Sequence, residues 1–174
     1  MTVTETTLEG VYLIQNKIFE DHRGFFVKTF HKDVFEANGL ETDFRESFYS
    51  VSKKNVLRGM HFQLPPHDHA KLVYVTSGKI LDVAVDIRKD SPTFGHCYST
   101  TLSDSNGHSL YMGKGFAHGF LTLSETATVV YMTTTVHSPE HDAGVRWDSF
   151  RFDWGIDSPV ISERDNKFMG LLNL

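Results

Sequence analysis

A series of short β-type segments separated by turn residues most constrains what this chain can fold into. Six such segments lie at residues 72–75, 80–87, 96–102, 108–112, 117–123 and 127–136. The turns between them contain Gly or Ser, and the last segment is rich in Val and Thr. Short strands at this spacing are typical of antiparallel sheets and not of alternating strands and helices. The pattern therefore predicts an all-β fold, either a sandwich or a jelly roll.

Helices are expected at only two peripheral places. Residues 31–38 end at Asn38-Gly39, a typical helix stop, and Ser162 can cap a short helix near the end of the sequence. The 174 residues contain no internal repeat, low-complexity tract or Gly/Ser-rich linker. These features predict a single domain over residues 1–174, which is long enough to bury a sizeable core.

Charge and cysteine content argue against several classes of protein. The formal net charge is -5, which disfavours binding of nucleic acid through bulk positive charge. Cys97 is the only cysteine, so an intrachain disulfide and a multi-cysteine metal site are not expected. No apolar run is long enough to cross a membrane, and the first eight residues lack the basic and apolar regions of a signal peptide. We therefore expect a cytoplasmic protein.

The segment from Arg58 to Lys71 concentrates titratable side chains around a Pro-Pro turn, as at the rim of a site. Within it, His61 lies in a strand that enters the turn. A histidine there can serve as a base, a metal ligand or a hydrogen-bonded core residue. Asp82, Asp86 and Asp165 are all available to orient its imidazole, and the sequence alone does not choose among them.

The histidine spacing resembles that of metal-binding jelly rolls of the cupin type. His67 and His69 lie two residues apart, and Gly113-x-Gly-x-x-His118 resembles the second cupin motif. The metal-binding pattern also needs a glutamate a few residues after the first pair, where this chain has Lys71. A cation at that position disfavours a divalent metal. We therefore expect the fold without the metal, and an exposed loop around His67 and His69.

Four further polar residues each allow a functional and a simpler interpretation. Arg23 and Arg58 both precede a glycine, which suits phosphate binding but also surface ion pairs in turns. Lys71 can stabilise an oxyanion if it points inward, or lie at the surface. Tyr131 can be a phenolic acid or a core residue. From the residue pattern alone, the surface ion pairs and the core tyrosine are the simpler interpretations.

Ten short motifs together resemble the dTDP-4-dehydrorhamnose 3,5-epimerase family. In order along the chain they are Asp21-x-Arg-Gly-Phe-Phe26, Leu57-Arg-Gly-Met-His-Phe-Gln63, Lys71-Leu-Val73, Asp82-Val-Ala-Val-Asp-Ile-Arg88, Ser91-Pro-Thr-Phe-Gly95, Gly115-Phe-Ala-His-Gly-Phe120, Leu123-Ser-Glu-Thr-Ala127, Ser138-Pro-Glu-His141, Val145-Arg-Trp-Asp148 and Ile161-Ser-Glu-Arg-Asp165. The resemblance implies a cupin-type jelly roll, a homodimer with exchanged N-terminal strands, and a nucleoside-diphosphate 4-keto-6-deoxysugar as substrate. It implies neither a metal nor another cofactor.

The resemblance also implies roles for individual residues. His61 matches the catalytic base, Asp165 the carboxylate that orients it, Lys71 the cation beside the C4 oxygen, and Tyr131 the acid on the opposite face. The implied reaction is epimerisation at C3, at C5 or at both, by removal and return of a proton next to the C4 ketone. Substrate-binding positions are implied for Arg23, Phe26, Lys28, Glu46, Phe48, Arg58 and His118.

Three departures from the family pattern bear on the nucleotide. Lys28 stands where the family usually has Glu, Glu46-Ser-Phe48 where it has Gln-Asp-Asn, and Tyr74 where it has Arg. The first two positions lie in the region that contacts the base, so our hypothesis is a CDP-linked substrate, with dTDP as the alternative. Other activities considered are a sugar-nucleotide 3,4-ketoisomerase, a metal-dependent cupin enzyme and a non-catalytic sugar-binding cupin.

Overall fold

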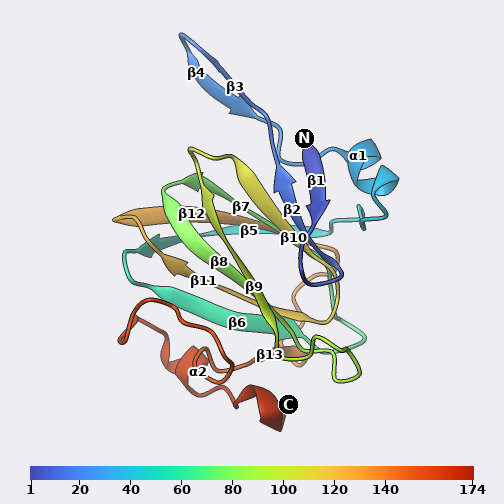
Figure 1. Cartoon of the computed structure of the whole chain (residues 1–174), viewed down its shortest axis with the longest axis vertical. Coiled ribbons are helices and arrows are strands. Elements are labelled where there is room, and N and C mark those ends of the chain that lie inside the picture. Colours follow the sequence, from blue (N-terminus) through green and yellow to red (C-terminus); the bar gives the residue numbers. More distant parts are fainter.

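Two antiparallel sheets stacked face to face form the body of the molecule, which a computed structural model describes over residues 1–174 (Figure 1). The six-stranded sheet has the order β1 (Thr2–Glu5), β2 (Val11–Gln15), β10 (His108–Met112), β7 (Lys71–Ser77), β12 (Thr126–Thr133) and β5 (Glu46–Lys53). The five-stranded sheet has the order β13 (Asp142–Gly144), β6 (Leu57–Gln63), β11 (Phe116–Thr122), β8 (Lys79–Asp86) and β9 (Cys97–Ser103). The predicted all-β jelly roll is confirmed.

The main apolar core lies between the two sheets and takes side chains from both. Val73 and Val129 come from the six-stranded sheet, Ile80 and Phe120 from the five-stranded sheet, and each is at most 1% exposed. Residues 80–87 appear apolar almost throughout because the outer face of β8 is also covered, by the C-terminal segment. Burying both faces of a sheet removes the usual polar alternation from its central strands. This layering leaves the space between the sheets as the natural place for a cavity.

Helices α1 (Lys32–Ala37), α2 (Glu163–Asn166) and the 3₁₀ turn η1 (Leu171–Asn173) lie at the periphery. Helix α1 packs Phe35 against the outer face of the six-stranded sheet and ends before Gly39, which has a φ of 71°. At α2 the Ser162 side chain accepts a hydrogen bond from the Asp165 N–H at 3.1 Å. Both predicted helices and the predicted cap are confirmed. None of the helices is long and apolar enough to cross a membrane.

The N-terminal region differs from the sequence prediction. The apolar residues Val11, Leu13 and Ile18 predict one strand over residues 10–18, but β2 ends at Gln15 and a separate hairpin begins at Ile18. The break falls at Asn16, whose buried side-chain amide donates hydrogen bonds to Gly107 O at 2.9 Å and Ser109 Oγ at 2.8 Å. The hairpin, formed by β3 (Ile18–Asp21) and β4 (Gly24–Val27), projects away from both sheets (Figure 1). Strand β1 was not expected, because its four residues are mostly polar.

Candidate active site

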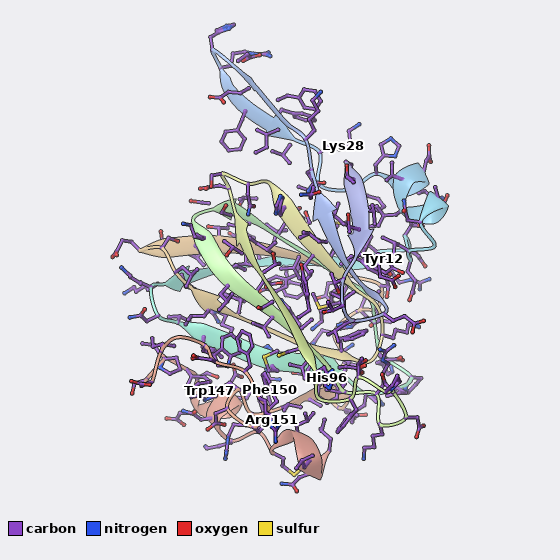
Figure 2. The ribbon with its side chains drawn as sticks, viewed as in Figure 1. Tyr12, Lys28, His96, Trp147, Phe150 and Arg151 are labelled. Atoms are coloured by element: carbon purple, nitrogen blue, oxygen red, sulfur yellow. The ribbon has the colours of Figure 1, made fainter.

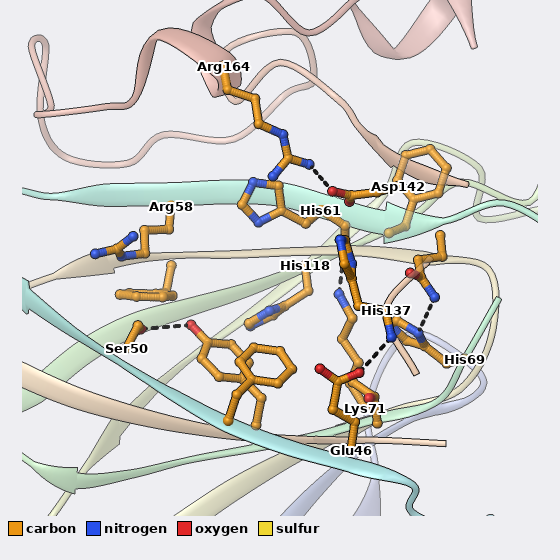
Figure 3. A pocket seen from close by; sticks show the side chains of 16 residues that line it. Glu46, Ser50, Arg58, His61, His69, Lys71, His118, His137, Asp142 and Arg164 are labelled. Carbon is orange, nitrogen blue, oxygen red and sulfur yellow. Dashed lines mark hydrogen bonds and ion pairs between the residues drawn. The ribbon is translucent and has the colours of Figure 1, made fainter. Parts of the chain in front are cut away.

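A cavity of about 410 Å³ lies between the two sheets and is lined mostly by polar side chains (Figure 3). The lining residues are Glu46, Phe48, Ser50, Arg58, His61, Phe62, Gln63, His69, Lys71, His118, Phe120, Tyr131, Thr133, His137, Asp142 and Arg164. Strands β5, β7 and β12 supply one wall, and β6 and β11 supply the other. The size is in the range of pockets that bind small organic ligands.

His61 on β6 is held by a carboxylate from the C-terminal helix. Its Nε2 lies 2.9 Å from Asp165 Oδ1, and Asp165 Oδ2 accepts a hydrogen bond from the Gly59 N–H at 3.1 Å. Asp165 is buried, whereas about a third of the His61 side chain reaches solvent. Of the three carboxylates that the sequence left open, Asp165 is therefore the one that contacts His61; Asp82 and Asp86 contact other partners.

Burial and hydrogen bonding set the charge states of this pair. Burial lowers the pKa of His61 below its ordinary value, although the nearby Asp165 carboxylate opposes the shift. Burial also opposes ionisation of Asp165, but hydrogen bonds from His61 and the Gly59 N–H hold its pKa below the ordinary value. At neutral pH the carboxylate is therefore charged and accepts the Nε2 proton, which leaves His61 Nδ1 free to accept a proton.

Lys71 on β7 is a buried cation next to His61. Its side chain reaches across the cavity floor, where Nζ donates a hydrogen bond to the His61 backbone oxygen at 2.9 Å. Burial lowers the pKa of Lys71 to about 8, with the charges of Asp142 and Asp82 opposing the shift. The ammonium is charged at neutral pH and has donor capacity left for a negatively charged oxygen.

Tyr131 on β12 lies in the same cavity and is also buried. Its hydroxyl is 3.3 Å from Ser50 Oγ, and Phe48 stacks on its ring with centroids 4.8 Å apart and planes 15° from parallel. The His118 ring meets Tyr131 edge-on at 6.0 Å. Burial raises the pKa of the Tyr131 phenol, so the hydroxyl keeps its proton at neutral pH.

His118 on β11 stands directly across the sheet from His61 and pairs with a different carboxylate. Its Nε2 lies 2.7 Å from Asp82 Oδ1, and both side chains are almost completely buried. Asp82 Oδ2 has no hydrogen-bond partner. The two histidines, each held by its own carboxylate, therefore line the same wall of the cavity.

Three of the predicted binding residues also line the cavity. Arg58 is fixed by a hydrogen bond from Nε to Ser52 Oγ at 2.8 Å, and Glu46 Oε2 accepts the His137 N–H at 2.6 Å. Phe48 is half-exposed between them on β5. Together with His118, these residues line the cavity with one cation, one anion and an aromatic face.

The other three predicted binding residues lie elsewhere in the chain. Arg23 and Phe26 belong to the projecting hairpin, where Arg23 pairs with Asp21 at 2.6 Å and Phe26 is 60% exposed. Figure 2 shows Lys28 at the base of that hairpin. None of the three lines the cavity of the same chain.

The sequence correctly predicts a loop around His67 and His69, but the prediction that these two residues are exposed is wrong. Both residues lie in a loop, but both are half-buried. His69 Nδ1 lies 3.1 Å from Thr135 Oγ1 and 3.2 Å from Gln63 Nε2, and burial lowers the pKa of His69 to about 3. Thr135 lies 66 residues further along the chain, just after β12, so the local sequence could not reveal this partner. No group of three or more His, Cys, Asp or Glu side chains is placed to hold a metal ion.

Several cavity residues were missed by the sequence analysis: Ser50, Phe62, Gln63, Phe120, Thr133, His137, Asp142 and Arg164. Ser50 could have been found, because residues 46, 48, 50 and 52 alternate along one strand and so share a face. Arg164 and Asp142 form an ion pair at 2.7 Å beside the cavity, a contact between segments with no shared local pattern.

A jelly roll whose cavity combines a carboxylate-bound histidine, a buried lysine and a buried tyrosine has the equipment of an isomerase that works by proton transfer. A family model described as dTDP-4-dehydrorhamnose 3,5-epimerase matches residues 5–173. The chain belongs to this family and is a sugar-nucleotide epimerase, as its motifs predicted.

Individual relatives agree over almost the full length. The dTDP-4-dehydrorhamnose 3,5-epimerase of Shigella flexneri is 42% identical, covering 95% of this chain and 93% of its own. The crystal structure of the Legionella pneumophila enzyme in complex with dTDP-4-keto-L-rhamnose has a TM-score of 0.93 at 36% identity, covering 98% of this chain and 93% of its own. The Mycobacterium tuberculosis epimerase structure has a TM-score of 0.95 at 36% identity, covering 99% and 90%.

The balance between burial and the Asp165 charge predicts how His61 titrates. We expect a His61 pKa below 6.5 in the wild type, and a lower value still in Asp165→Asn, because that change removes the charge that favours the imidazolium. Histidine side-chain ¹⁵N chemical shifts followed over pH measure both values. Asp82→Asn, which removes the partner of His118 instead, is the control. A His61 pKa that rises in Asp165→Asn contradicts the assignment.

Proposed function

We propose that the protein inverts C3, C5 or both in a nucleoside-diphosphate 4-keto-6-deoxyhexose, as a step in deoxysugar biosynthesis. The observation that carries the proposal is the convergence of His61, Lys71 and Tyr131 on one cavity. The C4 ketone acidifies hydrogens on the neighbouring carbons, so a base, a cation near the ketone oxygen and an acid are sufficient for the chemistry. The names of full-length relatives support the same reaction.

Each side chain has a defined part in the proposed reaction. Neutral His61 removes the proton next to the ketone and becomes an imidazolium, which the Asp165 carboxylate stabilises. The Lys71 ammonium stabilises the enolate oxygen that forms at C4. Tyr131 delivers a proton to the opposite face of the same carbon, which inverts its configuration. The sugar is neither oxidised nor reduced, since only protons are transferred.

We propose that the active form is a homodimer in which the N-terminal strands, with the β3–β4 hairpin, are exchanged. Phe19, Phe25 and Phe26 are each at least half-exposed on this projecting hairpin, an unusual apolar surface for a monomer. Exchange would also bring Arg23, Phe26 and Lys28 to the cavity of the partner.

We further propose that residues 1–174 form a single domain and that the protein is cytoplasmic. The lone free Cys97 supports the location, because proteins of oxidising compartments commonly pair their cysteines in disulfides.

Sedimentation velocity tests the dimer. The wild type is expected to sediment with the mass of two chains, and the double variant Phe25→Ser/Phe26→Ser to shift toward one chain, because the aromatic contact area is lost. Leu172→Ser removes an even more exposed apolar side chain, far from the hairpin, and should leave the mass unchanged. A monomeric wild type would rule out the exchange.

The carrier nucleotide is proposed to be CDP, with dTDP as the second candidate. Glu46 can only accept and Lys28 can only donate hydrogen bonds, which matches the N4 amino group and N3 of cytosine. The names of the relatives favour dTDP. Calorimetric titration with CDP and with dTDP decides between them.

We expect the dissociation constant for CDP to be at least about tenfold lower than that for dTDP, because one hydrogen bond to a charged group contributes about that factor. Glu46→Gln should reduce this ratio of dissociation constants. Glu41→Gln, which changes an exposed carboxylate outside the cavity, is the matched control. If the wild type binds dTDP more tightly than CDP, the CDP proposal is wrong and dTDP is the carrier nucleotide.

Solvent deuterium exchange tests the reaction itself, with NMR reading C3 and C5 of the CDP- or dTDP-linked 4-keto-6-deoxyglucose separately. His61→Ala should lose about 100-fold or more of the exchange, because general base catalysis contributes about that much. Tyr131→Phe should still exchange hydrogen on the His61 face but invert the carbon about 100-fold more slowly, because the general acid is lost. His141→Ala, outside the cavity, is the control. The proposal is refuted if His61→Ala exchanges deuterium at the wild-type rate. It is also refuted if the wild-type enzyme forms a 3-keto product, which indicates a ketoisomerase.

A further inference from the structure

Edge strand β5 directs one row of side chains to the side of its sheet that faces the cavity, and each member of the row contacts a cavity residue or the residue next to one. Glu46, Phe48, Ser50 and Ser52 alternate along the strand and point the same way. Glu46 holds the His137 backbone, and Ser52 holds the Arg58 guanidinium. The two central members, Phe48 and Ser50, both contact Tyr131 (Figure 3). Strand β5 therefore holds both the ring and the hydroxyl of Tyr131 in place.

Tyr131 is restrained on every side that the contacts define. Phe48 stands directly opposite it in the β5–β12 ladder and covers one ring face. His118 meets the ring edge-on, and Ser50 Oγ is the only hydrogen-bond partner of the phenol oxygen. The ring cannot turn without losing the Phe48 stack. The phenol therefore stays beside the Ser50 hydroxyl before and after any proton transfer.

The Ser50 hydroxyl is free to change its hydrogen-bonding direction. It makes no hydrogen bond except that with Tyr131, and it lines the cavity in a half-buried position. A hydroxyl both donates and accepts, and its hydrogen rotates to suit its partner. It can therefore donate to a lone pair of the phenol oxygen, which leaves the phenol hydrogen free to point at the substrate. The same hydrogen bond persists to the phenolate without any movement of the backbone.

We propose that Ser50 is a positioning residue for the acid step: it orients the Tyr131 proton and then stabilises the phenolate by donating its own hydroxyl hydrogen. The inference rests on the proposed function, because it needs Tyr131 as the acid. In the step, the Tyr131 O–H bond breaks and the electron pair of the enolate forms the new C–H bond. Tyr131 is left as phenolate and His61 as imidazolium, and solvent then returns one proton and removes the other.

Ser50→Ala tests the proposal when inversion and exchange are measured separately. Inversion should fall about tenfold or more, since a hydrogen bond to a charged group is lost from the transition state. Exchange on the His61 face should stay near the wild-type rate. Ser50→Thr keeps the hydroxyl and should restore inversion. Ser47→Ala removes an exposed serine of the same strand and is the matched control.

A double-mutant cycle separates positioning from a general structural effect. In a Tyr131→Phe background, Ser50→Ala should cause no further loss of inversion, because the hydroxyl it supports is already absent. The proposed role of Ser50 is wrong if Ser50→Ala lowers the rate of inversion a further tenfold in that background. It is also wrong if Ser50→Ala alone inverts the sugar at the wild-type rate. If instead Tyr131→Phe leaves inversion intact, the proposed acid is wrong and the failure belongs to the proposed function.

Discussion

The hydrogen bonds accepted by the Asp165 carboxylate connect the C-terminal segment to the rest of the site. One oxygen binds His61 and the other binds the Gly59 N–H, so a single buried group fixes both the imidazole and the strand that carries it. Burying a charged carboxylate costs free energy, and hydrogen bonds to its oxygens offset that cost. The C-terminal segment packs onto β6 through an apolar cluster that includes Trp154 and Leu171. This packing is therefore a condition for His61 to act as the proposed base.

Desolvation acts on three different groups in the cavity and gives each the charge that its chemistry needs. It disfavours the charged form of every titratable side chain, which keeps His61 unprotonated and Tyr131 protonated at neutral pH. Lys71 feels the same effect but starts from a higher pKa, so at about 8 it remains mostly charged. One environment can thus hold a base, an acid and a cation side by side because their ordinary pKa values differ.

Local pattern predicted the strands and the two helices well, because alternation and capping depend on neighbours in sequence. Resemblance, and not pattern, chose Asp165 from three carboxylates as the partner of His61, since 104 residues separate the pair. Spacing gave no reason to bury His69, because its partner Thr135 is 66 residues away in the sequence, in the segment that follows β12. The sequence also could not predict that Arg23 lies on a projecting hairpin, because turn residues indicate where the chain reverses but not in which direction the hairpin points.

Strand β5 forms a wall of the cavity and is also the edge of its sheet. Only one neighbour, β12, constrains its backbone, so exchange of its alternate side chains disturbs little of the interior packing. Glu46 and Phe48 can therefore be exchanged without displacing His61 and Lys71, which lie on the interior strands β6 and β7. The architecture separates a wall of the cavity that tolerates substitution from the strands that carry the proposed base and cation.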